Sequence, residues 1–261
     1  MAVQQTKHQV RDIAVRLYRD GAGEPVVFLH GSAGVPPWSP FFEKLAARCE
    51  LTVPEHPGFG ASDNPASIRN VGDLALYYLD FLDGLGRKVH LIGHSLGGWI
   101  AAELAVRNST QLKSLALIAP AGVRIKGVPS GDNFIWTPEE TARNLFHDQK
   151  LAEQRIARDQ AMSEEEADLA LTNRFAAAKF GWEPRWFNPA LERWLHRIKP
   201  PTLVLWGAED KLQPSRYAEV WKQRVPDVRV EIIPACGHLP LVEKADQTAD
   251  TLLGFIAGVR S

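Results

Sequence analysis

The stretch Val89-His90-Leu91-Ile92-Gly93-His94-Ser95-Leu96-Gly97-Gly98 decides the fold of this chain. An apolar run leads into a G-x-S-x-G pentapeptide, and Trp99 to Val106 continues in residues compatible with a helix. A sharp strand-to-helix turn needs small residues two positions before and after the serine, because larger side chains would collide with the neighbouring elements. The pattern predicts that Ser95 is held out above a sheet edge as a nucleophile. The alternative is a glycine-rich turn with a structural role only.

Composition places the chain among ordinary globular proteins. It has 261 residues, 45% hydrophobic and 23% charged, with a net charge of −1. This length suits one large α/β domain with an insertion, and the charge balance argues against nucleic-acid or polybasic membrane binding. No apolar stretch is long enough to span a membrane, and the first residues lack the apolar region of a signal peptide. We expect a cytoplasmic monomer or homodimer with free thiols at Cys49 and Cys236, acting on a small molecule.

Short apolar runs alternate with helical segments along most of the chain. Strands are expected at 10–18, 26–29, 51–53, 89–92, 115–118, 202–206 and 230–233, and helices at 41–48, 71–85 and 252–259. Continuous apolar strands separated by helices are typical of a parallel sheet that is buried on both faces. The predicted fold class is therefore α/β, with a mostly parallel β-sheet flanked by helices.

The alternation stops between residues 123 and 189, where no strand is predicted. Helices are expected at 138–146, 150–162 and 163–180, with Thr137 and Ser163 as N-caps and acidic residues in the first turns. We interpret 123–189 as a helical cap inserted after the sixth strand, with 1–122 and 190–261 forming the core.

A serine hydroxyl needs a base to take its proton, and the base needs an acid to fix its tautomer. Asp210 and His238 each follow a predicted strand, so they lie at the same sheet edge as Ser95. Asp210 is preferred to the adjacent Glu209, since neighbouring side chains diverge. His94 is next to Ser95 in the sequence but points away from it, so packing is its expected role.

The tetrahedral intermediate of such a reaction needs two N–H donors directed at its oxyanion. One is expected from the backbone of Leu96, at the start of the helix, where the helix dipole also favours negative charge. The other is expected from Ser32 in the loop His30-Gly31-Ser32-Ala33-Gly34, with Gly31 as the adjacent alternative.

These residues together resemble the α/β-hydrolase superfamily over nearly the whole chain. The matching motifs are His30-Gly31, Pro57-Gly58-Phe59-Gly60-Ala61-Ser62, Gly93-His94-Ser95-Leu96-Gly97-Gly98, Trp206-Gly207-Ala208-Glu209-Asp210 and Gly237-His238. The resemblance implies an α/β-hydrolase fold, a Ser95–Asp210–His238 triad, a two-donor oxyanion hole, a helical cap and no cofactor or metal.

Within the superfamily, this sequence resembles two kinds of protein. The Asn173-Arg174 and Asn188-Pro189 regions resemble capped carbon–carbon (meta-cleavage product) hydrolases, and also lipase- and esterase-like proteins. The loop Ser32-Ala33-Gly34-Val35 departs from the proline- and glycine-rich loop of the carbon–carbon hydrolases. A serine at position 95 argues against relatives with an aspartate nucleophile, while cofactor-free haloperoxidase-like relatives stay open.

Substrate contacts are expected between the sheet edge and the cap. The expected residues are Gly31, Trp38, Phe59, Trp99, Trp136, Arg174, Trp182, Trp186 and Leu239. The aromatic side chains suggest an apolar substrate, although each also suits packing of cap against core. Arg174 and Arg185 have the geometry to hold a carboxylate, or are solvated surface residues. We expect an esterase that acts on a small to medium apolar ester, with carbon–carbon bond hydrolysis or a non-catalytic receptor as alternatives.

Overall fold

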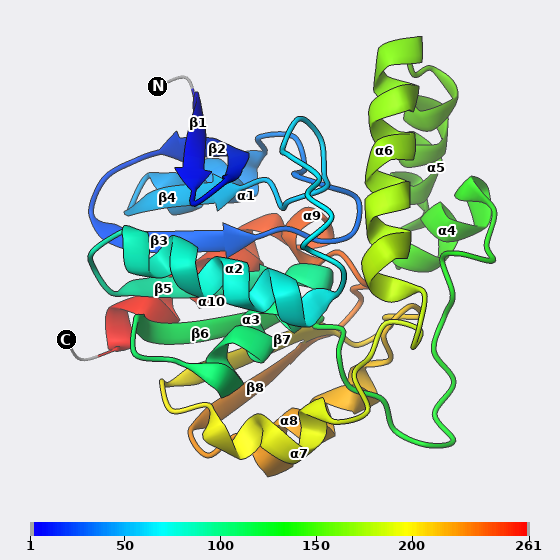
Figure 1. Ribbon diagram of the computed structural model, residues 1–261. Coiled ribbons are helices and arrows are strands. Elements are labelled where there is room, and N and C mark those ends of the chain that lie inside the picture. Colours follow the sequence, from blue (N-terminus) through cyan, green and yellow to red (C-terminus); the bar gives the residue numbers. More distant parts are fainter. Residues whose placement is uncertain (1–2, 260–261) are drawn as a thin grey trace.

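The computed structural model describes residues 3–259, and its centre is a sheet ordered β1-β2-β4-β3-β5-β6-β7-β8 (Figure 1). The strands are β1 (Gln4–Val10), β2 (Ile13–Asp20), β3 (Glu24–Leu29), β4 (Cys49–Pro54), β5 (Val89–His94), β6 (Leu112–Ile118), β7 (Thr202–Gly207) and β8 (Val228–Ile233). Pairing is antiparallel from β1 to β2 and from β2 to β4, and parallel from β4 through β8. The predicted fold class is therefore confirmed.

Helices cover both faces of the sheet. The core helices are α1 (Pro40–Ala46), α2 (Val71–Gly84), α3 (Leu96–Arg107), α7 (Leu191–Trp194), α8 (Ala218–Arg224), α9 (Pro240–Glu243) and α10 (Ala245–Gly258). One apolar cluster packs α2, α3 and α8 on one face, and a second packs α1 and α10 on the other. Strand β5 is buried along its whole length because it lies between these layers.

The N-terminal strand prediction was incomplete. The predicted run 10–18 is broken by a turn at Arg11, whose φ of 51° is in the left-handed region. Strand β1 runs back to Gln4 and pairs with β2 along its length. Most of its side chains are exposed, so no apolar alternation marked it in the sequence. Helices α7, α8 and α9 were likewise not predicted, being short segments between stronger signals.

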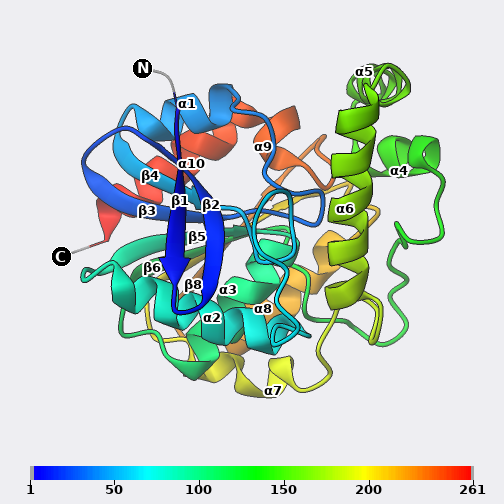
Figure 2. The same cartoon turned by 45° about the horizontal axis from the view of Figure 1, so that its top comes forward.

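A helical insertion, defined here as residues 123–189, separates β6 from β7. It contains α4 (Pro138–Leu145), α5 (Gln149–Gln160) and α6 (Glu164–Gly181). Thr137 and Ser163 cap α4 and α6 as predicted, each in a capping box with the glutamate three residues on. Helix α6 stands beside the ends of the parallel strands in both views (Figures 1 and 2).

The two ends of this insertion meet at one point. Gly122 and Phe187 form an isolated parallel bridge. The Gly122 N–H donates to the Trp186 carbonyl at 2.9 Å, and the Asn188 N–H donates to the Gly122 carbonyl at 3.0 Å. The chain therefore leaves the core and returns to it at adjacent positions.

Candidate active site

Ser95 sits at a strained turn between β5 and α3. Its φ of 52° and ψ of −112° are unusual for a residue with a side chain. A Cβ on Gly93 would lie 2.4 Å from the Gly97 carbonyl oxygen, and one on Gly97 would lie 2.1 Å from the Leu29 carbonyl oxygen. Both positions therefore require glycine, which is the physical reason for the spacing of the pentapeptide.

Ser95, His238 and Asp210 form a continuous hydrogen-bonded chain. The His238 Nε2 atom lies 2.9 Å from Ser95 Oγ, and Nδ1 lies 2.7 Å from Asp210 Oδ2. The exposed fractions are 6% for Ser95, 2% for His238 and 5% for Asp210. The structure thus brings together three residues that are far apart in the sequence, in a buried arrangement where each polar atom has a partner.

The Asp210 carboxylate is held by the turn that follows β7. Its Oδ1 accepts the N–H groups of Leu212 at 2.9 Å and Gln213 at 2.8 Å. Its Oδ2 also accepts the Trp206 indole N–H at 3.0 Å, a contact that the sequence analysis did not anticipate. The neighbouring Glu209 instead accepts the Cys236 N–H at 2.9 Å. The two acids therefore diverge, and the carboxylate bonded to His238 belongs to Asp210.

The loop after β3 lies against the nucleophile. A Cβ on Gly31 would lie 3.5 Å from Ser95 Cβ, so Gly31 borders the serine and Ser32 is the next residue of the loop. Leu96 begins α3, where the first N–H groups of a helix have no partner within the helix. The two predicted oxyanion donors thus belong to the two backbone segments that adjoin Ser95.

Three further histidines are buried around the site. Burial lowers the pKa of His94 to about 3 and of His56 to about 4, and it holds the pKa of His30 well below its usual range. The His94 Nε2 atom lies 3.1 Å from the His238 carbonyl oxygen, so His94 holds the backbone of that residue. His30 accepts the His56 N–H at 3.0 Å, and the two rings stack with centroids 3.6 Å apart. Neutral imidazoles therefore support the loops on either side of Ser95.

The model of the Alpha/beta hydrolase family matches residues 26–251, which include Ser95, Asp210 and His238. The chain belongs to this family. Among curated relatives, the 2-hydroxymuconate semialdehyde hydrolase of Pseudomonas sp. (strain CF600) is 27% identical over 258 residues, covering 94% of this chain and 91% of the relative. Lipase 1 of Psychrobacter immobilis is 26% identical over 263 residues, covering 90% of this chain and 77% of the relative.

A solved structure, that of a membrane phospholipase A described as a bacterial virulence factor, superposes on this hydrolase with a TM-score of 0.79. It is 28% identical, and the match covers 99% of this chain and 87% of that one. These three relatives are thus named as hydrolytic enzymes that act on different substrates. In residues 3–259 of this hydrolase, none of the helices has the length and apolar character needed to span a membrane.

Several aromatic residues predicted to contact substrate also hold the hydrolase together. Trp99 is 4% exposed, and its indole N–H donates to Glu103 Oε1 at 3.2 Å. Trp38 is half-buried and stacks on Phe42 with centroids 5.0 Å apart. Trp186 is 4% exposed and stacks on Phe134 with centroids 5.0 Å apart. Each has a packing role in the structure, and its contact with substrate stays a prediction.

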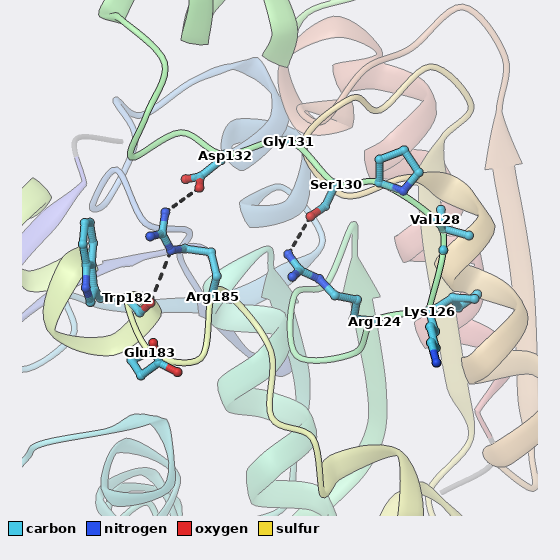
Figure 3. Close-up of a pocket in the computed structure, with 12 residues that line it drawn as sticks. Arg124, Lys126, Val128, Ser130, Gly131, Asp132, Trp182, Glu183 and Arg185 are labelled. Carbon is cyan, nitrogen blue, oxygen red and sulfur yellow. Dashed lines mark hydrogen bonds and ion pairs between the residues drawn. The ribbon is translucent and has the colours of Figure 1, made fainter.

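A surface groove of about 480 Å³ lies where the insertion joins the core (Figure 3). It is lined by residues 124–132 with Trp182, Glu183 and Arg185, and none of Ser95, Asp210 and His238 is among its lining residues. Arg185 pairs with Asp132 and lies over the Trp182 ring at 4.3 Å. Its guanidinium is therefore engaged at this groove, away from the residues around Ser95.

The remaining predicted contacts have mixed positions. Arg174 is exposed on α6, and Leu239 is half-buried directly after His238. Phe59 is fully buried and stacks on Phe180 of α6 with centroids 6.3 Å apart. Trp136 is half-buried and packs over Gly131, where a Cβ would lie 2.1 Å from the indole. Among these four, Leu239 is next to His238 in the sequence, and Phe59 packs the core against the insertion.

Proposed function

We propose that this hydrolase is a serine hydrolase that cleaves small to medium apolar carboxylic esters through an acyl-enzyme. The observation that supports it best is the hydrogen-bonded chain from Ser95 Oγ through His238 to Asp210, at 2.9 Å and 2.7 Å. Such a chain is the arrangement that makes a serine hydroxyl nucleophilic at neutral pH.

In this mechanism, Ser95 Oγ attacks the ester carbonyl carbon while its proton passes to His238 Nε2. Asp210 accepts the Nδ1–H of the imidazole, which fixes the tautomer and stabilises the imidazolium that forms. The backbone N–H groups of Leu96 and Ser32 donate to the oxyanion of the tetrahedral intermediate. His238 then gives the proton to the leaving alkoxide, so that the alcohol departs and the acyl group remains on Ser95.

Water completes the cycle by the same steps. His238 takes a proton from a water molecule, whose oxygen attacks the acyl carbon, and the collapse of the second tetrahedral intermediate returns the proton to Ser95 Oγ. Because Nε2 must be unprotonated to act as a base, turnover falls on acidification. The carboxylic acid leaves and the free enzyme is restored.

The substitution Ser95→Ala tests this proposal. We expect hydrolysis of a series of p-nitrophenyl esters to fall at least about a thousandfold, because the nucleophile is lost while the buried site keeps its shape. Wild-type protein should also be labelled by a fluorophosphonate probe, and Ser95→Ala should not. The exposed Ser67→Ala serves as the control. Unchanged turnover in Ser95→Ala would refute the mechanism.

Carbon–carbon bond hydrolysis is the second candidate, and the similarity to the 2-hydroxymuconate semialdehyde hydrolase favours it. Its substrates, as ketone-bearing dienoic acids, carry a carboxylate, and Arg174 is the exposed arginine of α6 available to bind one. Wild-type protein incubated with a vinylogous 1,5-diketone acid should then bleach its yellow dienolate. Retention of the colour, with rapid ester turnover, would decide for the esterase.

Arg174→Ala sharpens this choice. If the substrate is an acid, the substitution should raise its KM about tenfold and leave neutral esters unaffected, because only the acid forms the charge-assisted bond. Arg158→Ala, an exposed arginine on α5, is the matched control. A KM for the acid that is the same in Arg174→Ala, Arg158→Ala and the wild type would remove Arg174 from substrate binding.

A further inference from the structure

We propose that Asn173 of the helical insertion is a positioning residue for residues 30–34, called the oxyanion loop below. When α6 packs on the core, Asn173 holds this loop so that the Ser32 N–H is oriented to donate to the oxyanion. This inference rests on the proposed function, because an oxyanion loop matters only if an oxyanion forms. It assigns the insertion a part in the chemical step, beyond covering the substrate.

The Asn173 side chain joins two loops of the core. Its exposed fraction is 8%, although the neighbouring residues of α6 are mostly exposed. Its Oδ1 accepts the Gly60 N–H at 2.9 Å, and its Nδ2 donates to the Ala33 carbonyl at 3.1 Å. Gly60 follows β4 and Ala33 follows β3, so one amide connects the insertion to both loops. A buried amide with each end bonded has one orientation available to it.

The Ala33 carbonyl belongs to the turn that carries Ser32. The Gly34 N–H donates to the Gly31 carbonyl at 3.2 Å, which closes the turn from Gly31 to Gly34. Gly34 has a φ of +91°, and a Cβ there would lie 2.4 Å from Asn173 Nδ2. The amide therefore packs directly over the turn while it holds the carbonyl. Because Gly31 borders Ser95 at the other end, the orientation of the Ser32 peptide depends on a turn that Asn173 fixes.

A second anchor of α6 provides a comparison. Lys179 Nζ donates to Asn64 Oδ1 at 2.9 Å and to the Pro65 carbonyl at 3.4 Å. This anchor also ties α6 to the segment after β4, but none of its partners belongs to residues 31–34. Removing it weakens the seating of α6 without touching the oxyanion loop directly. The two anchors therefore separate general docking of the helix from positioning of the loop.

The expected consequence lies in kcat. Oxyanion donors act on charge that develops in the transition state, so a misplaced Ser32 N–H raises the barrier without weakening substrate binding. A displacement of about 1 Å in such a group costs up to about a hundredfold in rate. We therefore expect a fall in kcat with KM nearly constant.

The experiment compares Asn173→Asp, Asn173→Leu and Lys179→Met in ester hydrolysis. Asn173→Asp keeps an acceptor for the Gly60 N–H and loses the donor to Ala33, whereas Asn173→Leu loses both. For both, kcat should fall about ten- to a hundredfold with KM within about threefold. Affinity for a trifluoromethyl ketone, which forms an alkoxide at Ser95, should fall in the same proportion. Lys179→Met should lower the melting temperature and leave kcat near that of the wild type.

A pH profile adds a readout that a purely structural role would not move. Protonation of the introduced carboxyl in Asn173→Asp restores a donor for the Ala33 carbonyl, and burial raises the pKa of such a group. The ratio of variant to wild-type kcat should therefore rise as the pH falls, while that of Asn173→Leu stays constant. A ratio that does not change with pH in Asn173→Asp contradicts the proposal.

Two other outcomes would also overturn the inference. One is that folded Asn173→Asp and Asn173→Leu keep the kcat and the ketone affinity of the wild type. The other is that Lys179→Met loses as much kcat as the two Asn173 variants. Failure of the proposed function has a different signature, since wild-type protein would then show neither ester turnover nor labelling by a fluorophosphonate.

Discussion

The sheet edge around Ser95 and the helical insertion beside it are built in different ways. At the sheet edge, Ser95, His238 and Asp210 are buried, and backbone N–H groups or neighbouring rings fix each of them. In the three helices of the insertion, the buried residues are Ala142 in α4, Ala152 in α5 and five residues in α6. Phe175 of α6 is 69% exposed and Trp182 is 55% exposed. The residues around Ser95 are thus held in a tightly packed framework, whereas most residues in the helices of the insertion are at least partly exposed.

This difference leads to an expectation about relatives in the same family that are named for different substrates. The curated relatives include a 2-hydroxymuconate semialdehyde hydrolase and a lipase, both similar to this chain over most of its length. Substitutions at exposed positions of the insertion cost little stability, whereas substitutions at the packed edge cost more. We therefore expect differences in substrate choice among the relatives to lie in the insertion rather than at the packed edge around Ser95.

The largest expected effect is in the elbow, where Gly97→Ala places a Cβ 2.1 Å from the Leu29 carbonyl oxygen. Since backbone on both sides has to move, we expect the free energy of unfolding to fall by about 3 kcal/mol or more. Gly254→Ala on α10 is the matched control, because nothing lies within 4 Å of its Cβ position. That change should stabilise the helix by about 1 kcal/mol. Equal changes in the unfolding free energy of Gly97→Ala and Gly254→Ala in urea denaturation would show that the elbow is no more tightly packed than the exposed face of α10.

Acid should act next, through the buried histidines of the core. Burial lowers the pKa of His56 to about 4 and of His94 to about 3, while the unfolded chain takes up these protons near pH 6.5. The free energy of unfolding therefore keeps its full value above about pH 6.5. As the pH falls below 6.5, it decreases by up to about 1.4 kcal/mol per pH unit for each such histidine. Below the folded-state pKa values, the loss levels off.

His56→Gln tests the assignment of this acid sensitivity. Urea denaturation between pH 7.5 and 5 should show a shallower loss in His56→Gln than in the wild type, with a difference that begins near pH 6.5 and approaches about 1.4 kcal/mol per pH unit below it. His196→Gln, on an exposed turn, is the control. An unchanged slope in His56→Gln would show that other groups destabilise the fold in acid.

The smallest effect is expected in the insertion. Ser163→Ala removes the cap bond to the Glu166 N–H and should cost about 1 kcal/mol, while Ser163→Asp keeps an acceptor and should cost little. Hydrogen exchange should report the loss as faster opening of the first turn of α6, with protection of β5 unchanged. Faster exchange throughout β5 would mean that the insertion and the sheet open together.

The sequence was most informative where steric rules apply. The glycines at 93 and 97 and the apolar strands predicted the elbow and the parallel sheet, because few other residues fit a tight turn between buried elements. Asp210 and His238 were predicted as partners of Ser95 because each follows the end of such a strand. Caps at Thr137 and Ser163 predicted the starts of α4 and α6 for a similar local reason.

Long-range contacts were beyond the sequence. Nothing in the letters around Asn173 indicates that its amide reaches Ala33, 140 positions away. The pairing of Arg185 with Asp132 and the indole of Trp206 on Asp210 depend equally on tertiary packing. Strand β1 was missed because its exposed polar residues are held by backbone pairing with β2, which leaves no apolar pattern.

The bridge between Gly122 and Phe187 has a consequence for how this architecture changes over time and in the laboratory. Because the insertion leaves and re-enters the core at neighbouring positions, the distance between β6 and β7 is independent of its length. Closing a loop costs free energy that grows only with the logarithm of its length. Segments of quite different size are therefore exchangeable at this junction, and a graft that keeps Gly122 and residues 186–188 retains the hydrogen bonds that join the two ends.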